Sequence, residues 1–320
     1  MNAHQEPAGI QLSAKPKVTM LSVWVNNLRK HYLLYLMFLP AAFFFIIVKY
    51  VPMVGIVIAF KDYNFVDGLW GSPWVGLSNF ELLFSHPQSL QIIRNTLILS
   101  ITAILISFPF PIILAILLNE VRSMRFKRWA QTLIYLPYFF SWVVVGGIIV
   151  TIFSIETGFA NQVMEAITGR RYEFLYNEGS WIAIFLASGI WKEAGYGAII
   201  YLAALGSVDM HLYEAANLDG ANKWRQIWHV TLPGLRLTIV IMLILGMGSA
   251  IDLGFDRFYS LQNPVVSNVA EVMSTYVYKM GIVQGEFSFS ATMGLFESIV
   301  AFIMIVGTNA IARKFDNALW

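Results

Sequence analysis

The sequence predicts an all-α membrane protein with six transmembrane helices. Its composition is 58% hydrophobic and only 12% charged, whereas a soluble domain carries about twice that charged fraction. Runs of about 20 apolar residues, the length that crosses a hydrocarbon core of about 30 Å, recur along the chain. These runs are continuous, which favours helices over a barrel, because the strands of a barrel alternate between lipid-facing and interior residues.

The apolar runs give the order of the spans. We place them near residues 32–50, 96–118, 132–153, 181–205, 236–254 and 291–311. Residues 1–30 form a polar, basic N-terminal segment, and no run of small residues ending in a cleavage site follows the first span, so we expect an uncleaved anchor. Residues 31–313 then form one transmembrane domain, and 314–320 form a short tail.

Two further apolar stretches lie outside these spans. Residues 51–60 are too short to cross a bilayer and suit an interfacial or re-entrant piece. Residues 265–282 predict an amphipathic helix that lies on the membrane or covers the bundle. Its apolar positions recur at helical spacing: Val269, Val272, Met273, Tyr276, Val277 and Met280.

The distribution of lysine and arginine predicts the orientation. Six spans place both termini on one side of the membrane, and the positive-inside rule assigns the more basic side to the cytoplasm. That side carries Lys15, Lys17, Arg29, Lys30, Arg122, Arg125, Lys127, Arg128, Lys223, Arg225, Arg236, Arg313 and Lys314. We therefore expect a multi-pass protein of the cytoplasmic (inner) membrane with both termini in the cytoplasm.

Composition also excludes several classes of function. A net charge of +2 without a basic stripe argues against a nucleic-acid partner. The chain has no cysteine and therefore no disulfide or thiolate site, and its histidines are not spaced as metal ligands. No lysine follows a glycine, so the phosphate-binding loop of an ATPase is absent from the sequence. We expect no cofactor or metal on this chain.

The segment between the fourth and fifth spans is polar, although apolar runs flank it. Residues 214–233 read EAANLDGANKWRQIWHVTLP. We predict a helix from Asp209, which can cap it, to Leu218, with Gly220 ending it. A second helix from Ala221 would place Trp224, Ile227 and Trp228 on one apolar face, and Pro233 suits the first turn of the next span.

The spacing in this segment resembles the EAA signature loop of the membrane subunits of ABC importers. Glu214, Ala215 and Ala216 are followed after three residues by Gly220, and the segment closes on Leu232 and Pro233. The narrower resemblance is to the permeases of carbohydrate importers related to the maltose permeases, in the polysaccharide and oligosaccharide branch. It rests on YVPMVGIVIAFKDYN at 50–64, GSPWVGLSNF at 71–80, WKEAGYGAIIYLAAL at 191–205 and FDRFYSLQNP at 255–264.

The resemblance implies a type I importer permease fold and a set of partners. These are an ATPase dimer that binds ATP and Mg²⁺, a second permease that is usually a different chain, and an extracytoplasmic sugar-binding protein. In the family the EAA helix docks into the ATPase, and its acidic first residue contacts that subunit. The coupling loop would be residues 209–233, with the implied coupling residues Glu214, Ala215, Ala216, Asp219, Gly220, Leu232 and Pro233.

Several charged residues fall within the predicted spans, where a lone charge costs about 3 kcal/mol or more. They could line a sugar path with nearby aromatic side chains, or Lys192 could pair with a carboxylate while the aromatics pack. The candidates are Trp191, Lys192, Glu193, Tyr196, Asp252 and Glu297. Lys192 or Arg257 could also suit an acidic sugar such as a uronate oligomer, but the sequence does not identify the saccharide.

Two functions remain to be compared. The first is the non-catalytic permease subunit of an ATP-driven importer of oligo- or polysaccharides, working by alternating access. The second is an ion-coupled secondary sugar carrier, which would use the buried charges but leaves the EAA loop unexplained, and the six spans show no obvious internal repeat.

Overall fold

The computed structural model describes residues 29–248 and 254–314. The chain divides into two compact units, Met1–Gly55 and Ile56–Trp320. In the first unit, α2 (Tyr32–Phe45), a π turn (Ile46–Tyr50) and α3 (Val51–Met53) follow one another without a break, and none of their residues is buried. An apolar helix that is exposed all round suits contact with lipid. The first predicted span is therefore helical.

Helical turns continue through Phe60, because Val54–Phe60 forms a 3-10 helix. The stretch Tyr32–Phe60 is apolar and long enough to cross a membrane as one helix. The structure thus differs from the separate interfacial piece that we predicted for residues 51–60. A glycine at position 55 and a proline at position 52 do not interrupt the turns here, since Pro52 falls in the first turn of α3, where its missing N–H costs little.

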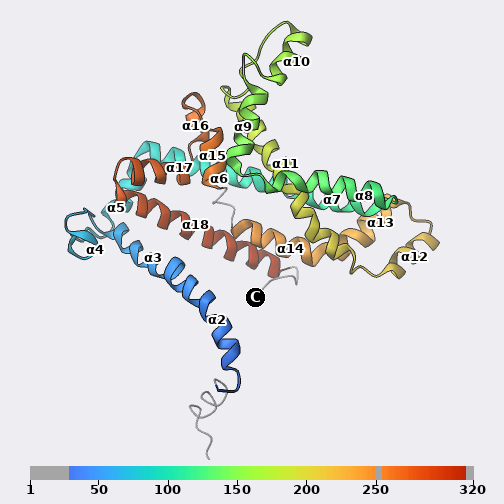
Figure 1. The fold of residues 1–320 in the computed structure, drawn as a ribbon, viewed down its shortest axis with the longest axis horizontal. Helices are drawn as coiled ribbons and strands as arrows, with labels where there is room; N and C mark the ends of the chain where they lie inside the picture. Colours follow the sequence, from blue (N-terminus) through green and yellow to red (C-terminus); the bar gives the residue numbers. More distant parts are fainter. Residues whose placement is uncertain (1–28, 249–253, 315–320) are drawn as a thin grey trace, which may run out of the picture. The chain divides into compact units, whose positions relative to one another are not determined.

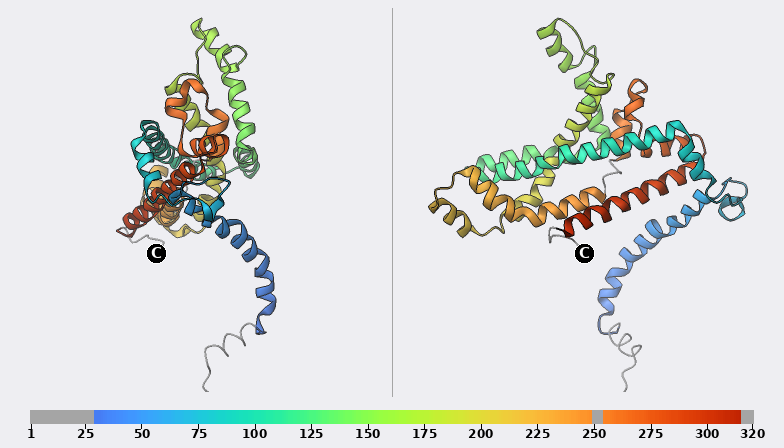
Figure 2. Two further views of the ribbon diagram at one scale, coloured as in Figure 1. Left: turned by 90° about the vertical axis from the view of Figure 1, so that its left-hand side faces the viewer. Right: turned by 180° about the vertical axis from the view of Figure 1, so that it is seen from behind.

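In the described part of the second unit the regular secondary structure is helical, apart from one isolated bridge between Lys61 and Trp74 (Figure 1). Its α-helices are α4 (Gly68–Gly71), α5 (Ser78–Ser85), α6 (Pro87–Ser107), α7 (Pro109–Glu120), α8 (Met124–Tyr135), α9 (Trp142–Phe153), α10 (Phe159–Thr168), α11 (Glu178–Leu205), α12 (Met210–Leu218), α13 (Lys223–Gln226), α14 (Leu232–Gly248), α15 (Phe255–Leu261), α16 (Ser267–Ala270), α17 (Met273–Val277) and α18 (Phe287–Arg313). Helices α14 and α18 run side by side (Figure 2).

In the described residues, four helical stretches are long and apolar enough to cross a membrane: Tyr32–Phe60, Pro87–Glu120, Lys223–Gly248 and Phe287–Arg313. A bent pair in the region of the third predicted span would make a fifth. Helix α11 has 28 residues, so it is long enough by length alone, but it is not among these stretches. The all-α class is confirmed, and the count of six spans stays a prediction.

The third span is not the single helix that we predicted for residues 132–153. Met124–Phe139 and Trp142–Phe153 meet at an angle of 102°. The backbone at Phe140 is extended, and the Ser141 hydroxyl accepts a hydrogen bond from the Val144 N–H at 3.3 Å, which starts α9 afresh. Ser141, an N-cap residue four positions after Pro137, therefore divides an otherwise continuous apolar run.

The amphipathic helix predicted for residues 265–282 is also divided. The backbone at Glu271 and Val272 is extended, and this separates α16 from α17. Met273 is fully buried in a cluster with Ile92 and Phe289, and its N–H donates to the Thr96 hydroxyl at 2.9 Å. The predicted apolar positions pack against the bundle, which fits the alternative that the segment covers the bundle.

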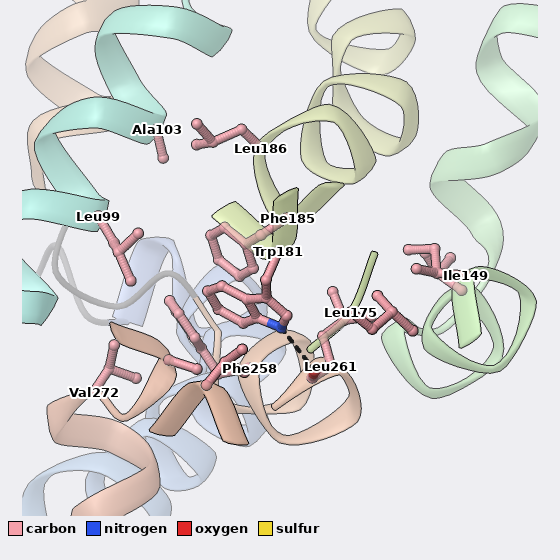
Figure 3. Packing of buried hydrophobic residues seen from close by; sticks show 13 residues of the cluster. Leu99, Ala103, Ile149, Leu175, Trp181, Phe185, Leu186, Phe258, Leu261 and Val272 are labelled. Carbon is pink, nitrogen blue, oxygen red and sulfur yellow. Dashed lines mark hydrogen bonds between the residues drawn. The ribbon is translucent and has the colours of Figure 1, made fainter. Parts of the chain in front are cut away.

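The largest buried cluster joins α6, α9, α11 and α15 (Figure 3). The Trp181 and Phe185 rings stack with centroids 5.2 Å apart, and Phe258 lies 4.5 Å from Phe185. The Trp181 indole N–H donates to the Leu261 carbonyl at 2.9 Å, so the polar atom of this buried ring has its partner. Helix α11 supplies the centre of this core.

Glycines on α11 allow three other elements to approach it closely. A Cβ at Gly195 would lie 2.1 Å from the Ile134 carbonyl oxygen, and one at Gly197 would lie 3.1 Å from Pro111. A Cβ at Gly189 would lie 2.3 Å from a guanidinium nitrogen of Arg257. Small residues permit such close packing between membrane helices.

The adjacent glycines of α9 provide a matched test of this packing. A Cβ at Gly146 would lie 2.6 Å from the Ser260 Cβ, whereas no atom lies within 4 Å of a Cβ at Gly147. We expect Gly146→Ala to lower the stability by about 1–3 kcal/mol and Gly147→Ala to leave it unchanged or slightly raised, since alanine favours helix. Thermal unfolding of both variants in one detergent measures this, and equal melting temperatures would contradict the close approach.

Candidate functional site

Helix α12 forms where the sequence predicted it. The Asp209 carboxylate accepts from the His211 N–H at 2.9 Å and caps the helix, which ends after Leu218. Gly220 has a φ of +74°, a left-handed conformation that glycine adopts without strain. The Ala221 N–H then donates to the Ala216 carbonyl at 2.9 Å. A capped helix and a tight glycine turn therefore define the shape of this loop.

One face of α12 carries a carboxylate between two apolar side chains. Met210, Glu214 and Leu218 are spaced four residues apart and lie above one another on the helix. Leu218 is 90% exposed and Met210 is 67% exposed, and no residue of α12 is buried. The Glu214 carboxylate lies 3.3 Å from Nδ1 of His211 and stays largely exposed. An exposed apolar face with one central charge is typical of a surface that a partner covers.

Buried polar contacts fix α12 to the helix that follows it. Gln226 is 4% exposed, and its side-chain amide donates to the Asn217 side-chain oxygen at 2.6 Å and to the Ala221 carbonyl at 3.1 Å. The Tyr213 hydroxyl lies 3.0 Å from the Thr231 hydroxyl. We did not single out Asn217, Gln226 or Thr231 from the sequence, although they are uncharged polar residues within the motif. These bonds make the loop one rigid unit.

The far end of the loop enters the bundle. Helix α13, a π turn (Ile227–Thr231) and α14 follow without a break, with Leu232 half-buried and Pro233 in the first turn of α14. Leu235 is fully buried in a cluster with Tyr201 of α11 and Ile112 of α7. The Lys223 ammonium also lies 2.9 Å from the Glu120 carboxylate at the end of α7. The loop is therefore in contact with α7, α11 and α14 through its second half.

The remaining predicted coupling residues lie on the surface of this unit. Ala215 and Asp219 are exposed, and Ala216 is half-buried. The Asp219 N–H donates to the Ala215 carbonyl at 3.0 Å as the helix ends. The structure therefore brings the seven predicted coupling residues into one loop, with Leu232 and Pro233 at its junction with the bundle.

Lys192 is buried without an ion pair to any described carboxylate. It is 7% exposed, and its ammonium donates to the Tyr138 carbonyl at 2.9 Å and lies over the rings of Tyr138 and Trp142, 5.1 and 5.4 Å from their centroids. Of the three carboxylates predicted as its possible partner, neither Glu193 nor Glu297 forms an ion pair with Lys192 among the described residues, and pairing with Asp252 stays a prediction. Asp252 lies outside the described residues.

The predicted pathway residues do not form one site. Tyr196 stacks on Tyr138 with centroids 3.8 Å apart, and Glu193 is exposed on α11. Trp191 lines a different hollow with Ile148 and Ile152. Helical spacing explains the separation, since residues 191 and 193 point about 200° apart on one helix.

Glu297 lines a hollow of about 790 Å³ in the second unit. Its polar wall adds Ser274, Ser290 and Ser298, and its aromatic wall includes Phe255, Tyr278 and Phe287. Of this set, we named only Glu297 from the sequence. The signal is a stripe of small and polar residues on α18 at helical spacing, comprising Ser290, Gly294, Glu297, Ser298 and Ala301.

Arg257 does not line this hollow either. It is buried between Trp142 and Phe185, with its guanidinium 4.9 and 3.8 Å from the two ring centroids. One of its nitrogens donates to the Phe185 carbonyl at 2.5 Å. Arg257 and Lys192 thus hold α9, α11 and α15 together, and neither supports an acidic sugar by direct contact.

The chemistry available to these groups is binding rather than bond making. Within the described residues, no group of three or more His, Asp or Glu side chains could hold a metal ion. The loop offers a surface for a protein partner, and the hollow offers hydroxyls, one carboxylate and aromatic faces for a polyhydroxylated ligand.

Comparison with known proteins identifies relatives along nearly the whole chain. Residues 107–319 match the family model described as "Binding-protein-dependent transport system inner membrane component". Protein LplB of Bacillus subtilis (strain 168) is 45% identical over 294 residues, covering 92% of each chain. The polygalacturonan/rhamnogalacturonan transport system permease protein YteP of the same organism is 46% identical over 284 residues, covering 89% of this chain and 88% of its own.

A solved structure matches the fold as well. A chain of a bacterial ABC transporter involved in the import of the acidic polysaccharide alginate superimposes with a TM-score of 0.84 and 37% identity, covering 91% of this chain and 98% of that chain. A second structure of a bacterial alginate ABC transporter, in complex with an alginate pentasaccharide-bound periplasmic protein, matches with a TM-score of 0.84 and 36% identity, covering 92% of this chain and 98% of that chain.

Proposed function

The chain belongs to the family of inner membrane components of binding-protein-dependent transport systems, and we propose that the substrate it carries is an oligo- or polysaccharide. As the permease subunit of an ABC importer it is not itself an enzyme. The ion-coupled carrier considered from the sequence does not fit this family. The names of the relatives support a saccharide, since YteP is named for polygalacturonan and rhamnogalacturonan transport.

The exposed Met210, Glu214 and Leu218 face of α12 is the observation that carries the coupling mechanism. A separate ATPase dimer, which binds ATP and Mg²⁺, covers this face. Closure of the dimer displaces α12, and the hydrogen bonds of Gln226 and the ion pair of Lys223 pass the displacement to α7 and α14. The bundle then alternates between outward- and inward-facing states.

The other partners follow from the family. A second permease, a different chain, completes the pathway opposite the hollow around Glu297. An extracytoplasmic sugar-binding protein delivers the saccharide, which agrees with the periplasmic protein in one of the matching structures. The hydroxyls of the sugar would bond to Glu297 and the three serines, and its rings would pack on Phe255 and Tyr278.

The orientation follows from charge. Residues 1–30, the loop 209–233 and the tail 314–320 lie in the cytoplasm, where the excess of Lys and Arg places them. Since the chain has no cysteine, single cysteines report their own side of the membrane. We expect a membrane-impermeant maleimide to label Ile167→Cys on α10 in intact cells and Leu218→Cys only after permeabilisation. Labelling of Leu218→Cys in intact cells would exclude a cytosolic ATPase as its partner.

Charge reversal at Glu214 tests the docking face. We expect Glu214→Lys to reduce the ATPase subunit that co-purifies with the tagged chain by about tenfold or more, because a like or unpaired charge at an interface costs several kcal/mol. Arg128→Glu is the matched control, since it changes an exposed charge on α8 by the same two units. Unchanged co-purification in Glu214→Lys, with normal membrane insertion, would contradict the assignment.

Substitution of Glu297 tests the pathway. We expect Glu297→Ala to lower uptake of labelled pectin-derived oligosaccharides by about tenfold, the loss of one charged hydrogen bond, while the ATPase still co-purifies. Ile299→Ala is the control, because Ile299 is an exposed residue of the same helix outside the hollow. Equal uptake in the two variants would remove Glu297 from the pathway.

A further inference from the structure

A second hollow lies beside the coupling loop and is lined only by apolar residues. It has a volume of about 480 Å³ and runs between α7 and the continuous helix of α13 and α14. Its walls include Ile112, Ile116, Leu117, Trp224, Trp228 and Leu232. Along α7 it extends from Pro109 to Leu117, about 12 Å at the helical rise. Trp224 is 72% exposed and Trp228 is 64% exposed, so this wall is open to its surroundings.

Cations gather at one end of this groove. Lys223 and Arg225 flank Trp224 in the sequence, and both are exposed. The Lys223–Glu120 ion pair places this ammonium beside the end of α7, three residues beyond Leu117. Arg122 follows in the exposed turn between α7 and α8, which lies at the same end of the unit as α13 (Figure 1). Glu120 offsets the charge of Lys223, and Arg225 and Arg122 add two exposed positive charges, each two residues in the sequence from a member of this ion pair.

The groove therefore matches an amphiphilic ligand, which has a charged end and an apolar chain. It has a cation at one end and apolar surface along its length, and the only hydrogen-bonding side-chain groups on its walls are the indole N–H donors of Trp224 and Trp228. We propose that it binds an anionic phospholipid, with one acyl chain along α7 and the phosphate beside Lys223 and Arg225. Tryptophans concentrate at the membrane interface, and basic residues next to a membrane helix attract anionic headgroups.

The site is separate from the docking face of α12. That face presents the carboxylate of Glu214 to its partner, whereas the groove presents cations and is lined by α7, α13 and α14. A lipid at this position touches both α7 and the base of the coupling loop, so its headgroup would stabilise the loop where it joins the bundle.

Quenching by brominated lipids tests the proposal on the purified complex in nanodiscs. Bromine on the acyl chains quenches nearby tryptophans, and a Trp224→Phe/Trp228→Phe chain identifies the part of the signal that comes from the groove. We compare the mole fraction of each brominated lipid that quenches this part of the signal. The value for phosphatidylglycerol should be about ten times lower than the value for phosphatidylcholine with the same chains. A Lys223→Gln/Arg225→Gln chain should lose that preference.

The matched control is Arg170→Gln/Arg171→Gln, which removes two exposed cations near α10 and breaks the Arg171–Glu165 ion pair. It should keep the preference. Equal quenching by the two lipids would mean that the groove holds only annular lipid. A preference for phosphatidylglycerol that survives in Lys223→Gln/Arg225→Gln would mean that these cations do not select the anionic lipid. Quenching that appears only after the ATPase is removed would make the groove a protein interface. Each of these results overturns the proposal.

Discussion

Close approach of other elements to α11 is the constraint on which the rest of the second unit depends. At Gly189, Gly195 and Gly197 the neighbouring atoms occupy the space that a side chain would need. The helix is 28 residues long, about 42 Å at the helical rise. It carries Trp181 and Phe185 of one buried cluster near its start and Tyr201 and Leu205 of another near its end. The two clusters are therefore joined by one rigid element.

The coupling loop is built by polar contacts, in contrast to this apolar core. No side chain of α12 is buried, so the hydrophobic effect does little to hold it. Its position depends on Gln226 with Asn217 and on Tyr213 with Thr231. Directional bonds of this kind fix an angle between two helices, which is what an element that transmits displacement requires.

Much of this architecture could be predicted from the sequence because it depends on local signals. Asp209 and Gly220 determine where α12 begins and where its turn lies, and both act within a few residues of their own position. The last helix is mostly apolar, and its observed range of Phe287–Arg313 contains the predicted range of 291–311. The family resemblance rested on the same loop.

The features that the sequence did not reveal depend on contacts distant in the chain. Residues 132–153 are apolar on both sides of the bend at Phe140, so hydropathy does not reveal the angle between α8 and α9. The break before Met273 depends on the Thr96 hydroxyl, which accepts the Met273 N–H across 177 residues. One of the two alternatives for Lys192 paired it with a carboxylate, and the sequence did not show that the Tyr138 carbonyl and two aromatic rings lie around its ammonium. Such partners become apparent only when the helices are packed.

The exposed apolar side chains of α12 have a consequence for the synthesis of this protein in a cell. Met210, Leu212 and Leu218 are all largely exposed. Exposed hydrophobic side chains of this kind attract chaperones, proteases and other copies of the same chain. If the proposed ATPase covers these side chains, a copy synthesised in excess of that subunit would leave them uncovered. Balanced synthesis of the subunits is then a requirement imposed by three side chains on a helix of nine residues.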